Sequence, residues 1–87
     1  MLSKLRALIR DPHIVRAIEQ GIVQRTAGGI HNLRVAVTGD RLLIQGNTTT
    51  YYVRQLAELA AEQVLGFRDP ELIEFDITVR RHNARAR

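Results

Sequence analysis

The sequence contains no cysteine, and aromatic side chains make up only 5% of its 87 residues. Without cysteine the chain has no thiolate nucleophile, disulfide, zinc ribbon or iron–sulfur cluster. Its apolar runs are all shorter than the ~20 residues that a membrane-spanning helix needs. The first ten residues interrupt their apolar side chains too often for a signal peptide. We therefore expect a cytoplasmic protein that touches a membrane only at its periphery, if at all.

The chain is also too short for a large enzyme architecture. With 45% hydrophobic residues it has the composition of one small folded domain, and a domain of this size buries only roughly 60–65% of its unfolded surface. A deep substrate cavity would compete with the core for that surface. The sequence has neither a Walker loop nor a Gly-x-Ser-x-Gly nucleophile elbow, so we expect no enzyme activity and no cofactor.

Positive charge is concentrated at the two ends of the chain. The formal net charge is +4, and residues 1–10 and 80–87 together hold seven of the 13 basic residues and no acidic residue. The middle of the chain, 11–79, then has six basic and nine acidic residues, a net charge of −3. This pattern describes two basic arms on a mildly acidic body, not a basic binding face.

The first predicted helix covers about residues 12–26. Asp11 is a typical N-cap, and Pro12 fits the first helical position, where its missing N–H costs nothing. Apolar side chains then follow helical spacing, and Gly28-Gly29 should end the helix. Gly21 within it suggests either the close approach of another backbone or a glycine that is merely tolerated.

A β-hairpin should follow, because apolar residues alternate from Leu33 to Val37 and again at Leu42 and Ile44. Gly39-Asp40 supplies the glycine that a two-residue type II′ turn prefers at its first central position, and Gly46-Asn47 should close the second strand. A second helix is expected over about 50–65, capped by a threonine and ending at Gly66.

The cleanest strand pattern is residues 73–79, where Ile73, Phe75, Ile77 and Val79 alternate with charged or polar residues. A strand of this kind buries one side and leaves the other to water or a partner. We predict an α+β fold with the order α-β-β-α-β. It is a two-layer sandwich with a three-stranded mixed sheet, and two helices lie on one face.

From Asp40 to Gly46, through the threonine run 48–50, to the alanine-rich stretch 51–61, the chain resembles the BON domain. Leu42 and Ile44 match the two aliphatic positions of its second strand, and Gly46 matches its closing glycine. Asp40 stands where the family usually has glycine, the loop after Gly66 is longer, and Phe75 occupies a usually polar position. The resemblance implies a non-catalytic module of bacterial envelope-associated proteins that binds phospholipid surfaces or other proteins. It implies no catalytic residue, and the missing export signal puts an envelope location in doubt.

Side chains with catalytic or metal-binding potential are scattered. His13, His31 and His82 have no spacing that would place two nitrogens on one metal, so we predict no metal site. Glu58 and Glu62 lie one helical turn apart, where a solvated helix face explains them better than a shared proton or cation. A KH-like nucleic-acid-binding domain is the alternative reading, but the Gly-x-x-Gly loop between two helices is missing and the body is acidic.

We predict a partner-binding surface on the open face of the sheet, made by Arg34, Ala36, Leu43 and Gln45, with Tyr51 at its rim. Of the two neighbouring tyrosines, Tyr51 and Tyr52, we expect one to pack its ring in the core. A bare solvated sheet is the alternative explanation of this face. The expected partner is a second copy of the chain or another protein, because a small core gains from extra burial and the acidic body complements the basic arms.

The sequence divides into a basic amphipathic arm at 1–10, the domain at 11–80 and a basic tail at 81–87. The arms are expected to contact anionic surfaces such as phospholipid, although a helix extension packed on the core and a solubilising tail explain the same residues. Nucleic acid ranks below these partners. The residues proposed for anionic contacts are Lys4, Arg6, Arg10, Arg80, Arg81, Arg85 and Arg87.

Overall fold

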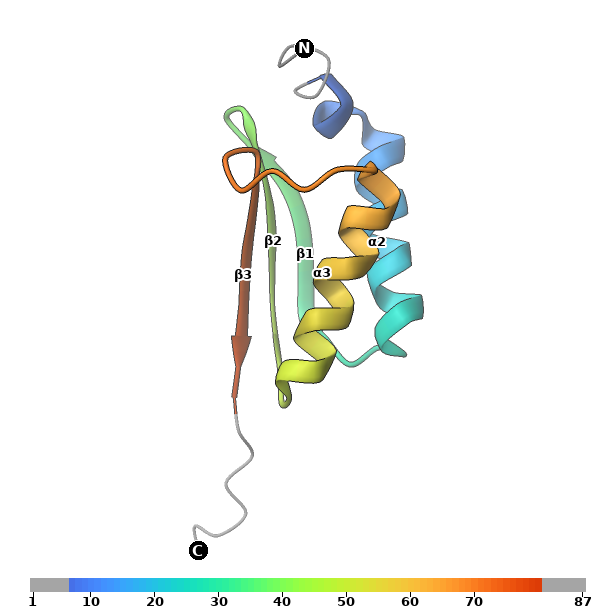
Figure 1. Cartoon of the computed structure of the whole chain (residues 1–87), viewed down its shortest axis with the longest axis vertical. Helices are drawn as coiled ribbons and strands as arrows, with labels where there is room; N and C mark the ends of the chain where they lie inside the picture. Colours follow the sequence, from blue (N-terminus) through green and yellow to red (C-terminus); the bar gives the residue numbers. More distant parts are fainter. Residues whose placement is uncertain (1–6, 81–87) are drawn as a thin grey trace, which may run out of the picture.

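The computed structural model describes residues 7–80, which form a sheet with its helices on one side (Figure 1). Helical residues 7–10 precede helix α2, Pro12–Thr26. The break between them is Asp11, whose backbone is extended and whose side chain accepts a hydrogen bond from the His13 N–H at 2.9 Å. The predicted N-cap, with proline at the first helical position, is confirmed.

Helix α2 ends at Thr26, as predicted, but the residue that turns the chain is not a glycine. Ala27 has the left-handed conformation with φ of 52°, which is unfavourable for a side chain with a Cβ. The Gly28 N–H donates to the Val23 carbonyl at 3.0 Å, and this bond closes the helix end. Gly28-Gly29 therefore follows the cap residue instead of supplying it.

Strands β1, His31–Thr38, and β2, Arg41–Thr48, form the predicted antiparallel hairpin. Gly39 has φ of 62°, as its place in the turn requires. Strand β2 continues through Gly46 and Asn47, so the expectation that they close it was wrong. His31 pairs with Asn47 and Arg34 with Gln45, which leaves two residues of β1 opposite Gly46. This is a β-bulge, and Asn32 within it has φ of 55°.

Helix α3, Tyr51–Leu65, connects β2 to β3, Ile73–Val79. Thr50 caps the helix by accepting the Val53 N–H at 3.1 Å. Strand β3 is parallel to β2, and the sheet order is β1-β2-β3. The predicted α+β sandwich with a three-stranded mixed sheet is confirmed.

The core lies between the sheet and the helices, and α2 runs antiparallel to α3 across it (Figure 1). Three alanines of α3 let that helix approach its neighbours closely. Ile9, which precedes α2, has no exposed surface and belongs to the same core. The buried apolar residues contributed by the helices and the sheet are Ile18, Ile22, Leu42, Ile44, Ala57, Ala60, Ala61, Leu65, Ile73 and Ile77.

Candidate interaction surface

One face of the sheet is free of helices, and its residues follow from the strand register. Leu42 and Ile44 are fully buried toward the helices, so Leu43 and Gln45, which alternate with them, point to the other side. Arg34 pairs with Gln45 and Ala36 with Leu43, and paired residues share a face. We call this surface the open face, and it consists of Arg34, Ala36, Thr38, Arg41, Leu43, Gln45, Asn47, Glu74, Asp76 and Thr78.

Nothing in residues 7–80 covers the open face, because the helices all lie on the opposite side of the sheet (Figure 1). Ala36, Leu43 and Gln45 are half-buried by their neighbours within the sheet, whereas Arg34 is exposed. The centre of the face is thus small and partly apolar, and its borders are charged. The structure brings the four sheet residues named from the sequence into two adjacent rows.

Charges on the open face are sorted by strand. The basic residues Arg34 and Arg41 lie on β1 and β2, and the acidic residues Glu74 and Asp76 lie on β3. Arg41 forms an ion pair with Glu74 at 3.4 Å, and both side chains are about half exposed. Such a pair contributes little to stability in water. Arg34 and Asp76 have no ion-pair partner among residues 7–80.

Arg34, Gln45 and Asp76 form a single row across the three strands, since Gln45 pairs with Arg34 on one side and with Asp76 on the other. Two strand spacings separate the outer residues, or roughly 9–10 Å between their Cα atoms. The row therefore carries one positive and one negative end around a neutral amide. Sequence reasoning missed Asp76, because the order of the strands is what brings β3 into the row.

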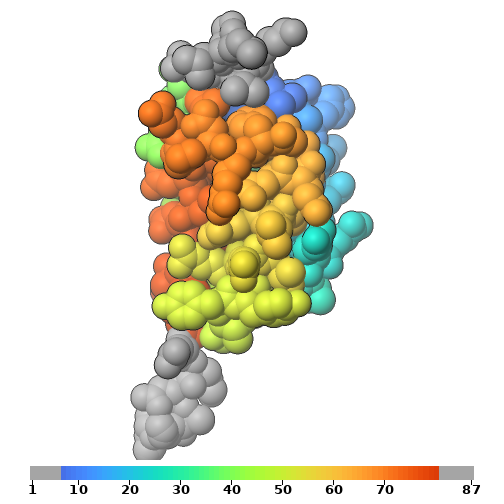
Figure 2. Space-filling model, in the orientation of Figure 1, coloured from blue at the N-terminus to red at the C-terminus, as the bar shows by residue number. Residues whose placement is uncertain are grey.

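Tyr51, predicted at the rim of this surface, is the first residue of α3. It lies in the helix layer, at the end of the body where the first turn of α3 is seen (Figure 2). There it lines a shallow depression with Arg54, Gln55 and Glu58 of the same helix. Tyr51 and Tyr52 are 63% and 68% exposed, so the prediction that one ring packs in the core was wrong.

Tyr51 and Tyr52 are exposed because neither lies on the side of α3 that packs against the core. The stripe of α3 that faces the core includes Ala57 and Ala61. Continued backward in steps of four, this stripe reaches Val53, which packs against the core. Positions 51 and 52 fall outside it.

Two of the basic residues proposed for anionic contacts lie within the described range. Arg10 is paired with Asp40 of the hairpin turn at 2.6 Å, and Arg80 follows β3, where its N–H donates to the Thr48 carbonyl at 2.7 Å. The segment that precedes α2 and the end of β3, which carry these two residues, lie at opposite ends of the described structure (Figure 1), so Arg10 and Arg80 do not form one basic patch. The remaining five, outside the described residues, are Lys4, Arg6, Arg81, Arg85 and Arg87.

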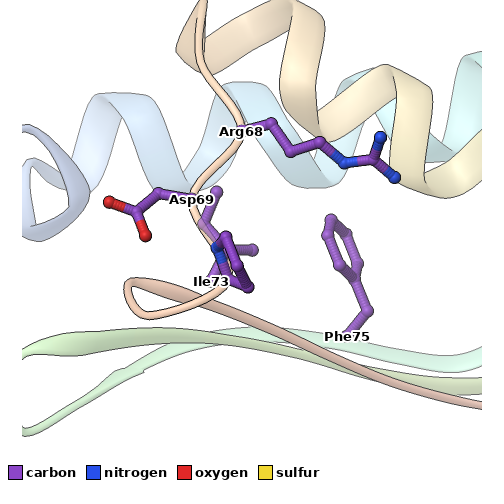
Figure 3. Close-up of a pocket in the computed structure, with 5 residues that line it drawn as sticks. Arg68, Asp69, Ile73 and Phe75 are labelled. Carbon is purple, nitrogen blue, oxygen red and sulfur yellow. The ribbon is translucent and has the colours of Figure 1, made fainter.

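A hollow of about 300 Å³ lies beside β3, lined by Arg68, Asp69, Pro70, Ile73 and Phe75. The Arg68 side chain extends toward the Phe75 ring, while the Asp69 carboxylate points away from the hollow (Figure 3). Its floor is apolar, and its two charged groups do not converge on one point. General acid–base chemistry needs groups that reach the same reacting atom, which this arrangement does not provide.

The two glutamates of α3 are each engaged by an arginine. Glu58 pairs with Arg54 at 3.2 Å, and Glu62 pairs with Arg68 at 2.9 Å. The Glu62–Arg68 contact lacks hydrogen-bond geometry, so the buried Oε2 of Glu62 has a charged neighbour but no hydrogen-bond donor. The two carboxylates thus have separate cationic partners instead of one shared cation.

His13 and His31 are exposed, and His82 lies outside the described range. Residues 7–80 contain no cluster of three or more histidine or carboxylate side chains arranged to hold a metal ion. No helix in the same range has the length and apolar character needed to cross a bilayer.

Comparisons with protein-family models, curated proteins and solved structures found no match to the chain. The resemblance to the BON domain therefore stays a prediction from the sequence. The candidate surface stands on the register, exposure and charge of its own residues.

Proposed function

We propose that the protein is a non-catalytic interaction module of the BON type that associates with itself or with another protein through the open face. The observation that supports this most is the face itself. It is a three-stranded surface with a half-buried apolar centre at Leu43 and Ala36, left uncovered by every described helix. Interfaces combine such a centre with a charged border.

The distribution of polar groups favours contact over chemistry. The hollow beside β3 has an apolar floor and only two charged side chains, which do not converge. The two glutamates of α3, Glu58 and Glu62, are each paired with an arginine. A binding function uses the surface that the fold leaves open and needs no further residue.

Attachment to anionic phospholipid is a second candidate, because residues 1–10 and 80–87 together hold seven basic residues and no acidic residue. The nucleic-acid alternative has less support. A KH domain clamps the backbone with a loop between two helices, whereas Gly28-Gly29 lies between α2 and strand β1.

The proposal is tested by sedimentation equilibrium of the full chain from about 10 μM to about 1 mM, a range that covers weak association. Leu43→Glu places a charge at the centre of the open face, and Leu59→Glu is its matched control on α3, where Leu59 is 41% exposed. We expect the wild type to show a concentration-dependent mass, the Leu43 variant to be a monomer and the Leu59 variant to behave as the wild type.

A wild type that stays monomeric over the whole range contradicts self-association. Loss of association in the Leu59 variant but not in the Leu43 variant contradicts the choice of face. Circular dichroism of both variants checks that each is folded.

A further inference from the structure

Resting on the proposed function, the geometry of the open face points to one specific partner arrangement. We propose that two copies stack their open faces about a two-fold axis parallel to β2, so that Arg34 of each copy lies over Asp76 of the other.

The row of Arg34, Gln45 and Asp76 makes the open face complementary in charge to a second copy of itself. Arg34 and Asp76 are exposed, carry opposite charges, lie on the two edge strands and flank the same central residue, Gln45. A two-fold axis along the central strand exchanges the edges, so β1 of one copy faces β3 of the other while each residue keeps its position along the strand direction. Each dimer then contains two reciprocal Arg34–Asp76 pairs, as an isologous interface requires.

The centre of the face is compatible with the same axis. Leu43 lies on β2, the strand above which the axis runs, so the two copies of Leu43 meet at the interface. Ala36 flanks Leu43 on β1, and Glu74 flanks it on β3. The small Ala36 side chain leaves room for the partner's Glu74, which is already paired with Arg41 in its own chain.

The two open faces can also stack about a two-fold axis that is parallel to the sheet but perpendicular to the strands. It would place β3 over β3 and β1 over β1, which sets the acidic pair Glu74 and Asp76 against their own copies. Like charges face to face are unfavourable in an interface. The charges of the two edge strands therefore favour the axis parallel to β2. That axis also brings the two copies of Arg41 together, but each Arg41 is paired with Glu74 of its own chain, whereas Asp76 has no ion-pair partner among residues 7–80.

The area of the open face limits how tightly the two copies can bind. Three strands about 4.8 Å apart and seven residues long at about 3.3 Å each cover on the order of 300–400 Å² in projection. A standard interface buries about 800 Å² per partner, so the dimer should be weak and sensitive to concentration. The reciprocal charge pairs would then set its orientation and its salt dependence more than its affinity.

Charge reversal tests the arrangement. In a dimer of Arg34→Asp chains, both reciprocal pairs become acid against acid, and in a dimer of Asp76→Arg chains both become base against base. We expect each variant alone to associate at least about tenfold more weakly than the wild type at low salt. Both side chains are exposed, so folding should be unaffected, and circular dichroism checks this.

Mixing the two variants is the decisive measurement. In the mixed dimer one chain has two acidic and the other two basic residues at positions 34 and 76, so both pairs are restored. We expect sedimentation of the equimolar mixture to recover the wild-type association. The double variant Arg34→Asp, Asp76→Arg should associate with itself but not with the wild type.

The outcomes separate this inference from the function on which it rests. If Leu43→Glu abolishes association while the charge reversals leave it unchanged, the open face is the interface and the two-fold arrangement is wrong. If the mixture of reversed chains does not recover association that each has lost, the arrangement is also overturned. A wild type that is monomeric throughout overturns the two-fold arrangement together with self-association, and leaves only binding of another protein from the proposed function.

Discussion

At the scale of single residues, Gly46 shows how closely the hairpin is packed. A Cβ at this position would lie 2.5 Å from Ile30 Cγ2 and 3.2 Å from the His31 carbonyl oxygen. Ile30 is buried and branched at Cβ, so its side chain has little freedom to move away. The bulge places an extra residue of β1 opposite Gly46, and the absence of a side chain at Gly46 leaves room for the Ile30 side chain and the His31 carbonyl.

We expect Gly46→Ala to lower the free energy of unfolding by about 1–3 kcal/mol, the usual cost of overpacking. Urea denaturation followed by circular dichroism measures the change. Gly21→Ala is the matched control, since its Cβ would meet Val64 Cγ2 at 3.5 Å, an ordinary contact. Within a helix this control should raise stability by about 0.5–1 kcal/mol. A stabilising Gly46→Ala would contradict the packing of the bulge.

The helical residues 7–10 belong to the folded core, although Asp11 separates them from α2. Ile9 has no exposed surface and packs within the core, while Arg10 beside it pairs with Asp40 of the hairpin turn. Of the two explanations weighed for this arm, packing on the domain is the one found for residues 7–10.

We expect Ile9→Ala to lower the free energy of unfolding by about 2–5 kcal/mol and Ile9→Val by about 0.5–1.5 kcal/mol. The milder variant keeps the test informative if the alanine variant does not fold. Val23→Ala is a control on the exposed side of α2, where the side chain is 46% exposed, and it should change stability much less. An Ile9→Ala protein as stable as the wild type would show that the segment is not part of the core.

The elements with strong local signals were predictable from the sequence. Helix α2 and strand β3 have the expected bounds. The Asp11 N-cap and Pro12 mark the start of α2, and the unbroken alternation of apolar and polar residues marks β3. The extension of β2 through Gly46 and Asn47 was missed, since glycine and asparagine favour turns locally. In the folded protein Gly46 and Asn47 stay in β2 because they lie opposite the bulge of β1, and this bulge exists only once the two strands have paired.

The candidate site was predictable only within the hairpin. Arg34, Ala36, Leu43 and Gln45 share a face because neighbouring strands in a hairpin have a register set by a short turn. Asp76 reaches the same row through a parallel pairing after a helix, and no local pattern specifies that register. The exposure of both tyrosine rings has a similar origin, since the phase of α3 depends on which alanines pack.

At the scale of the whole molecule, the two proposed contact surfaces carry different charge. The open face holds two basic and two acidic residues, Arg34, Arg41, Glu74 and Asp76, and is neutral overall. The chain ends hold seven basic residues and no acidic one. A neutral face and a basic end should respond differently to an anionic surface, so the two binding hypotheses separate experimentally.

We expect the protein to pellet with anionic vesicles and not with neutral ones, and added salt should weaken this attachment because the charges act within a Debye length. Since each basic residue near an anionic membrane is worth about 1 kcal/mol, replacing Arg81, Arg85 and Arg87 by glutamine should release most of the bound protein. Substitution is preferable to deleting residues 1–10, which would remove the buried Ile9. Leu43→Glu should leave pelleting unchanged if attachment is independent of the open face. Pelleting that survives neutralisation of both Lys4 and Arg6 together with the C-terminal arginines would rule out the ends as the source of attachment.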